Sequence, residues 1–368
     1  MGLLGLSGCG SPSSASVEMS SQTELVKTGS MELQYAENFA VDYYEDGYKM
    51  LTTLPDSKRY LLVPEGQPVP RGLDEDVSIL QEPLQNIYLV ASGAMDMFAS
   101  LDAVDQIRFS GQKQENWYIQ TAKDAMAAGD MIYAGKYSKP DYELLVSEGC
   151  DLAIENRMIT HSPEVVEMLQ SFDIPVMIEY SSYEQHPLGK VEWVKFFGAL
   201  TGKEAEAEEA FAEQTEILEK VESGEKTGKT IAFFYVTSNG LIQVRQSTDY
   251  IPKLIELAGG RYIFEDLEDS GSGRSTLNMQ VEDFYAGAKD ADILIYNSSI
   301  DGGVTTVDEL IGKCNILKDF KALQEGQVYC TTNDMYQQSM AIGYLLQDMH
   351  TVLTDDDTAK LRYLFLLQ

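Results

Sequence analysis

Four basic side chains stand out in this acidic chain because each lies in a loop rich in tyrosine, serine or threonine. The 368 residues include 59 acidic and 27 basic ones, for a net charge of −32. The four basic side chains are Lys136, Arg157, Arg245 and Arg274. A guanidinium beside a tyrosine ring suits a carboxylate or phosphate on a large, flat, partly apolar ligand. These loops therefore predict a site for such a ligand.

Tyrosine and serine side chains at the ends of predicted strands complete this expected site. Tyr137, Tyr183 and Tyr336 could pack on a ligand through their ring faces. In open α/β sheets, ligands bind beyond the carboxyl ends of the strands, where these loops lie. The predicted ligand-binding residues are Ser92, Lys136, Tyr137, Arg157, Tyr183, Arg245, Arg274 and Tyr336. The alternative is that these loop side chains only pack locally.

The sequence contains no recognisable motif for catalysis or for binding a bare metal ion. Its three histidines are far apart, and its four cysteines form no CxxC pair, whereas a transition-metal site usually needs several such ligands. The stretch GSGRS lacks the preceding strand and the spacing of a phosphate-binding loop, and no Gly-x-Ser-x-Gly occurs. We therefore expect no catalytic residues, no metal site and no cofactor of the protein's own.

The roles of one histidine and of one cysteine pair each have two possible interpretations. His186 could coordinate the metal of a bound complex axially, or it could be a hydrogen-bonded structural residue. Cys314 and Cys330 could form a disulfide, although Cys330 and Cys150 lie beside apolar runs and are expected to be buried thiols.

The first half of the chain predicts a parallel α/β sheet preceded by strands and turns. Order is expected from about Met31. Apolar strands alternate with helical segments such as 94–101 and 141–148, a pattern typical of parallel sheets. The predicted strands are Ile87–Ala91, Ile107–Ser110, Met131–Ala134, Leu152–Glu155 and Val176–Glu179.

A long helix and a second α/β region follow. Apolar residues recur at three- and four-residue steps over Lys203–Glu222, which predicts an amphipathic helix of about 30 Å. Strands are then predicted at Thr230–Val236, Ile293–Tyr296 and Val328–Thr331. The expected architecture is two Rossmann-like lobes joined by a single long α-helix, with the ligand cleft between the lobes. The expected parts are a tether (1–30), an N-terminal lobe (31–202), the helix (203–222) and a C-terminal lobe (223–368).

The start of the chain resembles a lipoprotein signal. Leu6-Ser7-Gly8-Cys9 is similar to a bacterial lipobox, in which the cysteine carries the lipid, and the small polar residues after it suit a flexible tether. Cys9 is thus the expected lipidation site, and the folded part is expected outside the cytoplasm, anchored at the outer face of the cytoplasmic membrane. Whether Met1 is the true start stays open.

Several segments, in their order, resemble one family. They are PDYELLVSEGCDLAI (140–154), HPLGKVEWVKFFGALTGKEAEA (186–207), LIELAGG (254–260) and MQVEDFYAGAKDADILIYN (279–297). From about Met31 to Gln368 the chain resembles the class III, helix-linked substrate-binding proteins of ABC importers, the type that binds iron–siderophore complexes, haem or cobalamin. The resemblance implies lobes that move little relative to each other.

The resemblance also implies a partner. In this family one glutamate on each lobe docks on the permease dimer, which works with an ATPase, and the matching residues here are Glu143 and Glu282. A helix start favours a carboxylate in any case, so both could simply be helix-start residues. Gln280 stands where the family has a small polar cap.

The leading expectation is a monomeric lipoprotein that captures an iron–siderophore-like complex for an ABC permease. A haem- or cobamide-binding protein of the same class is the alternative, and an extracytoplasmic enzyme on a two-lobed scaffold is a third. Nucleic acid is not an expected partner, because a net charge of −32 repels phosphate backbones.

Overall fold

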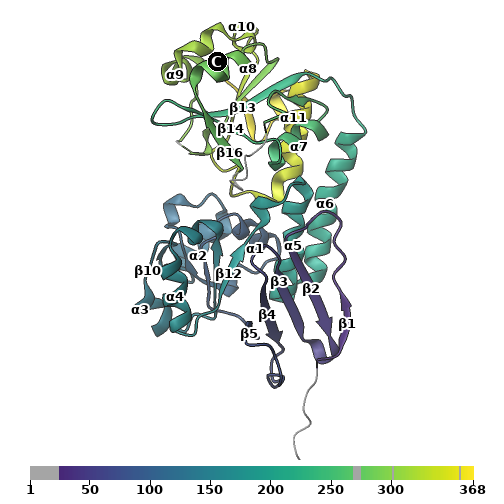
Figure 1. Cartoon of the computed structure of the whole chain (residues 1–368), viewed down its shortest axis with the longest axis vertical. Coiled ribbons are helices and arrows are strands. Elements are labelled where there is room, and N and C mark those ends of the chain that lie inside the picture. Colours follow the sequence, from purple (N-terminus) through teal and green to yellow (C-terminus); the bar gives the residue numbers. More distant parts are fainter. Residues whose placement is uncertain (1–24, 268–274, 301, 356–357) are drawn as a thin grey trace, which may run out of the picture.

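The chain folds into two α/β lobes, one above the other, with a long helix along one side of both (Figure 1). The computed structural model describes residues 25–267, 275–300, 302–355 and 358–368. Cys9 and Arg274 lie outside these described residues. The predicted fold class is confirmed.

A five-stranded parallel sheet forms the centre of the N-terminal lobe. Its strands are β6 (Ile87–Leu89), β7 (Ile107–Ser110), β8 (Ile132–Tyr133), β11 (Leu152–Asn156) and β12 (Val176–Glu179). The strand order is β12-β11-β6-β7-β8, and every pair is parallel. The order reverses between β6 and β11, and ligands bind at the carboxyl side of such a switch point. The helices of this sheet are α1 (Ala94–Ser100), α2 (Gln120–Ala128), α3 (Tyr142–Ser147) and α4 (Pro163–Ser171).

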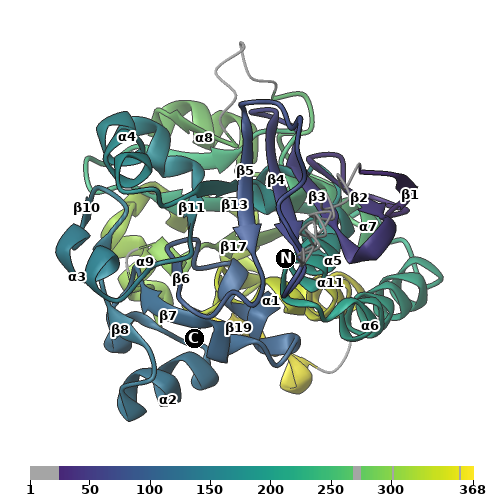
Figure 2. The same cartoon turned by 90° about the horizontal axis from the view of Figure 1, so that it is seen from below.

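A second sheet stands beside the parallel one in the same lobe (Figure 2). Its strands, paired in chain order, are β1 (Lys27–Ser30), β2 (Phe39–Tyr44), β3 (Lys49–Thr53), β4 (Lys58–Val63) and β5 (Val77–Gln81). Ordered structure thus begins before Met31, because Lys27–Ser30 pairs antiparallel with β2. One face of this sheet packs on helix α5 (Pro187–Thr201), where Phe39 lies 4.9 Å from Trp193 between ring centroids.

Helix α5 is buried from Pro187 to Leu200 and has charged residues inside this buried stretch. The carboxylate of Glu192 accepts hydrogen bonds from the backbone N–H groups of Gln34, Tyr35 and Ala36, at 2.8–3.1 Å. The chain segment before β2 is therefore fixed to α5 by a buried acid.

Helix α6 (Glu204–Glu222) leads from the N-terminal lobe to the C-terminal lobe and packs on α5 and on α11 (Ile342–Thr354). Its 19 residues span about 28 Å. One continuous apolar core includes Leu89 of the first sheet, Phe211 of α6 and Phe233 of the second lobe. This shared core favours a fixed relation between the lobes.

The C-terminal lobe has a seven-stranded mixed sheet. Its strands are β13 (Thr230–Val236), β14 (Ile242–Arg245), β15 (Arg261–Tyr262), β16 (Thr276–Met279), β17 (Ile293–Tyr296), β18 (Val328–Thr331) and β19 (Leu364–Leu366). The order is β16-β14-β13-β17-β18-β19, with β15 also on β13. Its further helices are α7 (Tyr250–Leu257), α8 (Val281–Ala288), α9 (Val307–Lys313) and α10 (Lys321–Gln324).

A loop of the C-terminal lobe, residues 332–341, reaches back to the N-terminal lobe. The side chain of Gln337 accepts a hydrogen bond from Tyr118 N and donates one to Asn116 O, both at 2.8 Å. The backbone N–H of Met340 donates to Asp96 of α1 at 2.7 Å. These bonds add a second contact between the lobes.

Two further observations concern the described residues only. Cys150, Cys314 and Cys330 form no disulfide there, so the alternative of a Cys314–Cys330 disulfide is not realised in this structure. No helix in the described part of the chain is both long and apolar enough to span a membrane.

Candidate ligand-binding site

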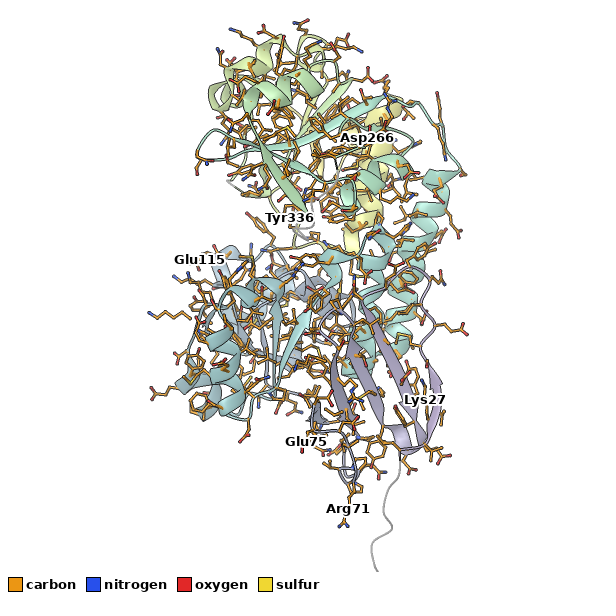
Figure 3. All side chains as sticks on the ribbon, viewed as in Figure 1. Lys27, Arg71, Glu75, Glu115, Asp266 and Tyr336 are labelled. Atoms are coloured by element: carbon orange, nitrogen blue, oxygen red, sulfur yellow. The ribbon has the colours of Figure 1, made fainter. Side chains whose placement is uncertain are left out.

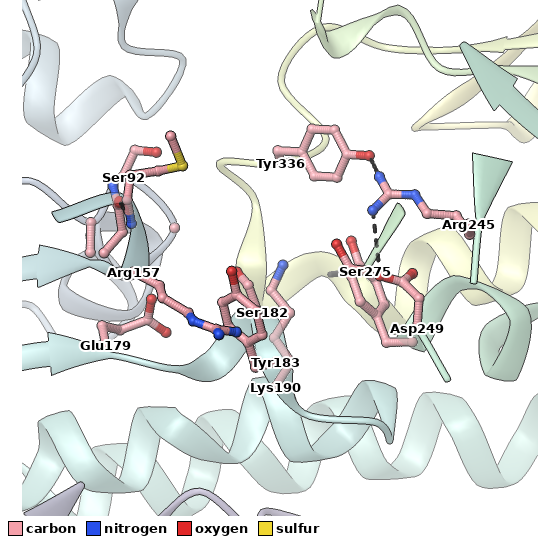
Figure 4. A pocket seen from close by; sticks show the side chains of 15 residues that line it. Ser92, Arg157, Glu179, Ser182, Tyr183, Lys190, Arg245, Asp249, Ser275 and Tyr336 are labelled. Carbon is pink, nitrogen blue, oxygen red and sulfur yellow. Dashed lines mark hydrogen bonds and ion pairs between the residues drawn. The ribbon is translucent and has the colours of Figure 1, made fainter. Parts of the chain in front are cut away.

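A cavity of about 290 Å³ lies between the two lobes (Figure 4). It is at the carboxyl ends of β6, β11 and β12 on one side and of β14 on the other. The N-terminal side is lined by Ala91, Ser92, Gly93, Asn156, Arg157, Met158, Glu179, Ser182, Tyr183 and Lys190. The C-terminal side is lined by Arg245, Asp249, Tyr250, Ser275 and Tyr336.

Arg157 and Tyr183 form the outer part of the N-terminal side. Each lies in a short 3-10 turn that follows a strand, β11 for Arg157 and β12 for Tyr183. The guanidinium carbon of Arg157 lies 4.6 Å from the ring centroid of Tyr183, a distance at which a cation is attracted to the ring face. Tyr183 is 40% exposed. This pair presents a flat, cationic and aromatic surface to the cavity.

Arg245, the last residue of β14, is buried and held on several sides. Its guanidinium pairs with Asp249 at 3.4 Å and donates to the hydroxyl of Tyr336. The Tyr336 hydroxyl also accepts a hydrogen bond from Asn297 at 2.8 Å. Figure 3 shows Tyr336 at the level between the lobes. The rotamers on this side of the cavity are therefore fixed by neighbouring side chains before any ligand enters.

Two buried carboxylates face the same cavity. Glu179, the last residue of β12, accepts a hydrogen bond from Ser181 N at 2.6 Å, and burial raises its pKa. Asp249 caps α7 by accepting from Ile251 N at 2.9 Å, and burial also raises its pKa, opposed by the charge of Arg245. Both acids thus have a structural partner and a side open to the cavity.

Lys190 lies at the floor of the cavity, in the first turn of α5. Only 3% of it is exposed, and its Nζ lies 4.9 Å from the ring centroid of Tyr250. Its amino group points up between the two sides of the cavity (Figure 4).

Five of the eight residues predicted for the ligand site line this cavity. They are Ser92, Arg157, Tyr183, Arg245 and Tyr336. Arg274 lies outside the described residues.

Lys136 and Tyr137, also predicted for the ligand site, do not line this cavity. The chain after β8 turns back in a hairpin, β9 (Gly135–Lys136) with β10 (Lys139–Pro140), and Tyr88 fixes this hairpin by donating to Gly135 O at 2.9 Å. Tyr137 packs against the apolar core under α3 and α4 instead. A loop that follows a strand does not reach the cleft when it folds back on its own lobe.

Four residues of the cavity were not predicted from the sequence: Glu179, Lys190, Asp249 and Tyr250. Glu179 ends a predicted strand, and the other three lie at the start of helices. The signal for Lys190 was its place in the apolar stretch PLGKVEWVKFF, where a lysine needs a specific reason to be buried.

His186 does not line this cavity and has a structural role. Its Nδ1 accepts a hydrogen bond from Leu188 N at 3.2 Å, its ring stacks on Tyr35 at 4.4 Å, and burial lowers its pKa. It borders a separate space of about 350 Å³ between the lobes, together with Lys253. Axial coordination of a ligand held between Arg157 and Arg245 is therefore not supported.

The two glutamates predicted for permease docking are exposed and lie on different lobes. Glu143 is in the first turn of α3, whose start is capped by Asp141 accepting from Leu144 N at 3.1 Å. Glu282 is in the first turn of α8, where Gln280 makes no capping side-chain bond. Both helices lie away from α6 (Figure 2).

The chain has distant relatives in sequence and similar solved structures. No protein-family model matches the chain. An uncharacterized lipoprotein of Methanocaldococcus jannaschii is 24% identical over 353 residues, which cover 87% of this chain and 81% of that protein. A second uncharacterized lipoprotein of the same organism is 25% identical over 323 residues, covering 84% of this chain and 79% of that protein.

Several similar solved structures are named as binding proteins. A possible iron-binding periplasmic protein of Staphylococcus epidermidis has a TM-score of 0.57 at 17% identity, over 73% of this chain and 98% of that one. The periplasmic haem-binding protein HutB of Vibrio cholerae has a TM-score of 0.58 at 14% identity, with the same coverage. The vitamin B12-binding protein BtuF of Vibrio cholerae has a TM-score of 0.52 at 13% identity, over 76% and 99%.

These likenesses, with the helix-linked lobes and the cavity between them, define the class of fold. The chain has the architecture of class III periplasmic binding proteins, as its sequence resemblance predicted.

Proposed function

We propose that this protein is an extracytoplasmic solute-binding lipoprotein of an ABC importer, which captures an iron–siderophore-like complex and delivers it to the permease. The observation that carries this proposal is the cavity between the lobes, where Arg157 and Tyr183 face Arg245 and Tyr336. Cationic and aromatic groups converging in one cleft suit a chelate with anionic oxygens and flat apolar parts.

The relatives support the location. Two relatives of similar length are named lipoproteins, and Cys9 lies in a lipobox-like stretch. In this proposal the lipid on Cys9 holds the receptor at the outer face of the cytoplasmic membrane, where its effective concentration near the permease is high. The receptor acts as a monomer.

A tetrapyrrole is the second candidate ligand, because solved structures of the same fold bind haem and vitamin B12. An enzymatic role has less support. The solved structures compared above are named as binding proteins, and the cavity acids Glu179 and Asp249 each hold a backbone N–H of their own lobe.

The ligand is tested by isothermal titration and by quenching of intrinsic fluorescence, using ferric siderophores, haemin and cyanocobalamin. Tyr183, Tyr250 and Tyr336 line the cavity, so a bound chelate should quench tyrosine emission. We expect a ferric chelate to bind with Kd below about 10 µM, or about −7 kcal/mol. If none of the panel binds at that level, the proposed ligand class is wrong.

Delivery to the permease is tested separately. The double variant Glu143→Ala/Glu282→Ala should keep ligand affinity, because both side chains are exposed and neither lines the cavity, but it should lose uptake in cells. A matched control replaces Glu164 and Asp308, acidic residues in the first turns of α4 and α9. Unchanged uptake in the Glu143/Glu282 variant would exclude these docking residues.

A further inference from the structure

Lys190 differs from the other buried lysine of helix α5 because no acidic side chain in the described part of the chain pairs with its ammonium. Lys195 is 4% exposed, and its ammonium pairs with Glu208 at 2.9 Å and with Glu192 at 3.6 Å. Lys190 is 3% exposed, yet among the described residues its Nζ makes no hydrogen bond and no ion pair, only the contact with the Tyr250 ring. An ammonium has three N–H donors, and burying them without acceptors is unfavourable.

The nearby carboxylates do not accept hydrogen bonds from the Lys190 ammonium. Glu179 accepts from Ser181 N, Asp249 from Ile251 N and Arg245, and Asp96 from Met340 N. Each of these acids is close enough to Lys190 for the lysine charge to lower the pKa of the acid. None of them forms an ion pair with it. The Nζ atom instead faces the cavity (Figure 4).

The cavity therefore has an excess of cations. Lys190 lies at its floor, Arg157 on the N-terminal side and Arg245 on the C-terminal side, against the two carboxylates Glu179 and Asp249. The excess is notable in a chain of net charge −32. The cavity volume of about 290 Å³ is just below the range typical of ligand pockets, roughly 300–1,000 Å³, which favours a small ligand.

We propose that Lys190 binds an anionic oxygen of the ligand, and that the ligand is a compact iron chelate with carboxylate oxygens. This inference rests on the proposed function and adds the chemical class of the chelate. One carboxylate would contact Lys190 at the floor, and a second would reach Arg157 or Arg245. A compact hydroxycarboxylate chelate of the ferric citrate type has these groups, whereas a cationic hydroxamate chelate lacks the carboxylates.

The test is isothermal titration of the full chain with ferric citrate, iron-free citrate, ferrioxamine B and haemin. We expect the unaltered protein to bind ferric citrate more tightly than ferrioxamine B, by at least about tenfold. Lys190→Met keeps the length of the side chain and removes its charge. This variant should bind ferric citrate on the order of 10- to 100-fold more weakly. The control Lys136→Met removes an exposed lysine outside the cavity and should change affinity by less than about twofold.

Thermal melting separates a ligand role from a structural one. If Lys190 serves the ligand, Lys190→Met melts close to the unaltered protein, while ferric citrate raises its melting temperature less. If Lys190 only balances Glu179 and Asp249, the ligand-free variant melts lower and its affinity for ferric citrate is unchanged, which would overturn the inference. The comparison of ferric citrate with ferrioxamine B does not depend on the variant folding.

The remaining outcomes distinguish this inference from the proposed function. Binding of ferrioxamine B or haemin without ferric citrate would keep the receptor and refute the carboxylate chelate. Binding of iron-free citrate alone, weakened by Lys190→Met, would support the anion site and refute the iron-chelate receptor. If none of the four compounds binds, the carboxylate chelate is refuted, and the panel of ferric siderophores and cyanocobalamin given above decides the proposed function.

Discussion

The two sides of the cleft hold their arginines in different ways. Arg245, on the C-terminal lobe, is 9% exposed and is fixed by Asp249, by the Tyr336 hydroxyl and by the ring faces of Phe233 and Tyr336. Arg157, on the N-terminal lobe, lies on the ring of Tyr183, which is itself 40% exposed. One side is built into the core of its lobe, and the other lies on surface turns.

This difference assigns different tasks to the two sides. A side chain that is already ordered loses little conformational entropy when it binds, so Arg245 can set the position of a ligand group. Arg157 and Tyr183 lie on short turns near solvent, where side chains adjust more readily. We therefore expect Arg245 and Tyr336 to contribute to stability as well as binding, and Arg157 and Tyr183 to contribute chiefly to binding.

The largest expected effect is on stability, and it compares the two arginines directly. Arg245→Met leaves Asp249 buried without its charge partner, so the free energy of unfolding should fall by about 2–4 kcal/mol. Arg157→Met removes a partly exposed stacking contact and should cost less than about 1 kcal/mol. Urea denaturation followed by circular dichroism measures both. Equal losses in the two variants would refute the asymmetry.

A second prediction concerns Asp96, which joins the sides by accepting a hydrogen bond from Met340 of the Tyr336 loop. Burial raises the pKa of Asp96 from 3.8 to about 6. Because the native state holds this proton more tightly than the unfolded chain, Asp96 makes the protein less stable as pH rises from about 4 to 6. The loss, fully present above pH 6, is about 1–3 kcal/mol.

Asp96→Asn isolates this effect because it keeps an oxygen acceptor for Met340 and removes the titration. Relative to the unaltered protein, the variant should gain stability between pH 4.5 and pH 7.5, as measured by urea denaturation at both values. A difference between the two proteins that is the same at both pH values would show that Asp96 does not titrate in this window.

Many strands could be predicted from the sequence because each is a short apolar run between turn residues. Ile107–Ser110, Thr230–Val236 and Val328–Thr331 have the predicted bounds. Helix α5 gave a weaker signal because it is buried on all sides and so lacks a polar face with helical period. Glu192 accepts hydrogen bonds from backbone N–H groups more than 150 residues earlier in the chain. Such a long-range contact leaves no local pattern in the sequence, so it could not be predicted.

The same reasoning explains which site residues could be predicted. Arg157 and Tyr183 follow parallel strands whose carboxyl ends meet at the cleft, so the rule for open α/β sheets locates them. Arg245 ends β14, which runs antiparallel to β13, so this rule does not explain its place at the cleft. Lys136 also follows a strand, but the hairpin at β9 and β10 directs the chain back to its own lobe. Lys190 reaches the cleft from a helix below it, a direction that the rule does not cover.

The smallest expected effect separates the ring of Tyr183 from its hydroxyl and tests whether the N-terminal side acts through its surface. Arg157 contacts the ring face of Tyr183 at 4.6 Å. Tyr183→Phe keeps that face, so titration should give an affinity for the ligand within about twofold of the unaltered protein. Arg157→Gln removes the charge and should weaken binding on the order of tenfold, with little change in stability. A large loss of ligand affinity in Tyr183→Phe would mean that the hydroxyl binds the ligand directly. Tyr183 would then position the ligand as specifically as Arg245 does, and the expected difference between the two sides of the cleft would be refuted.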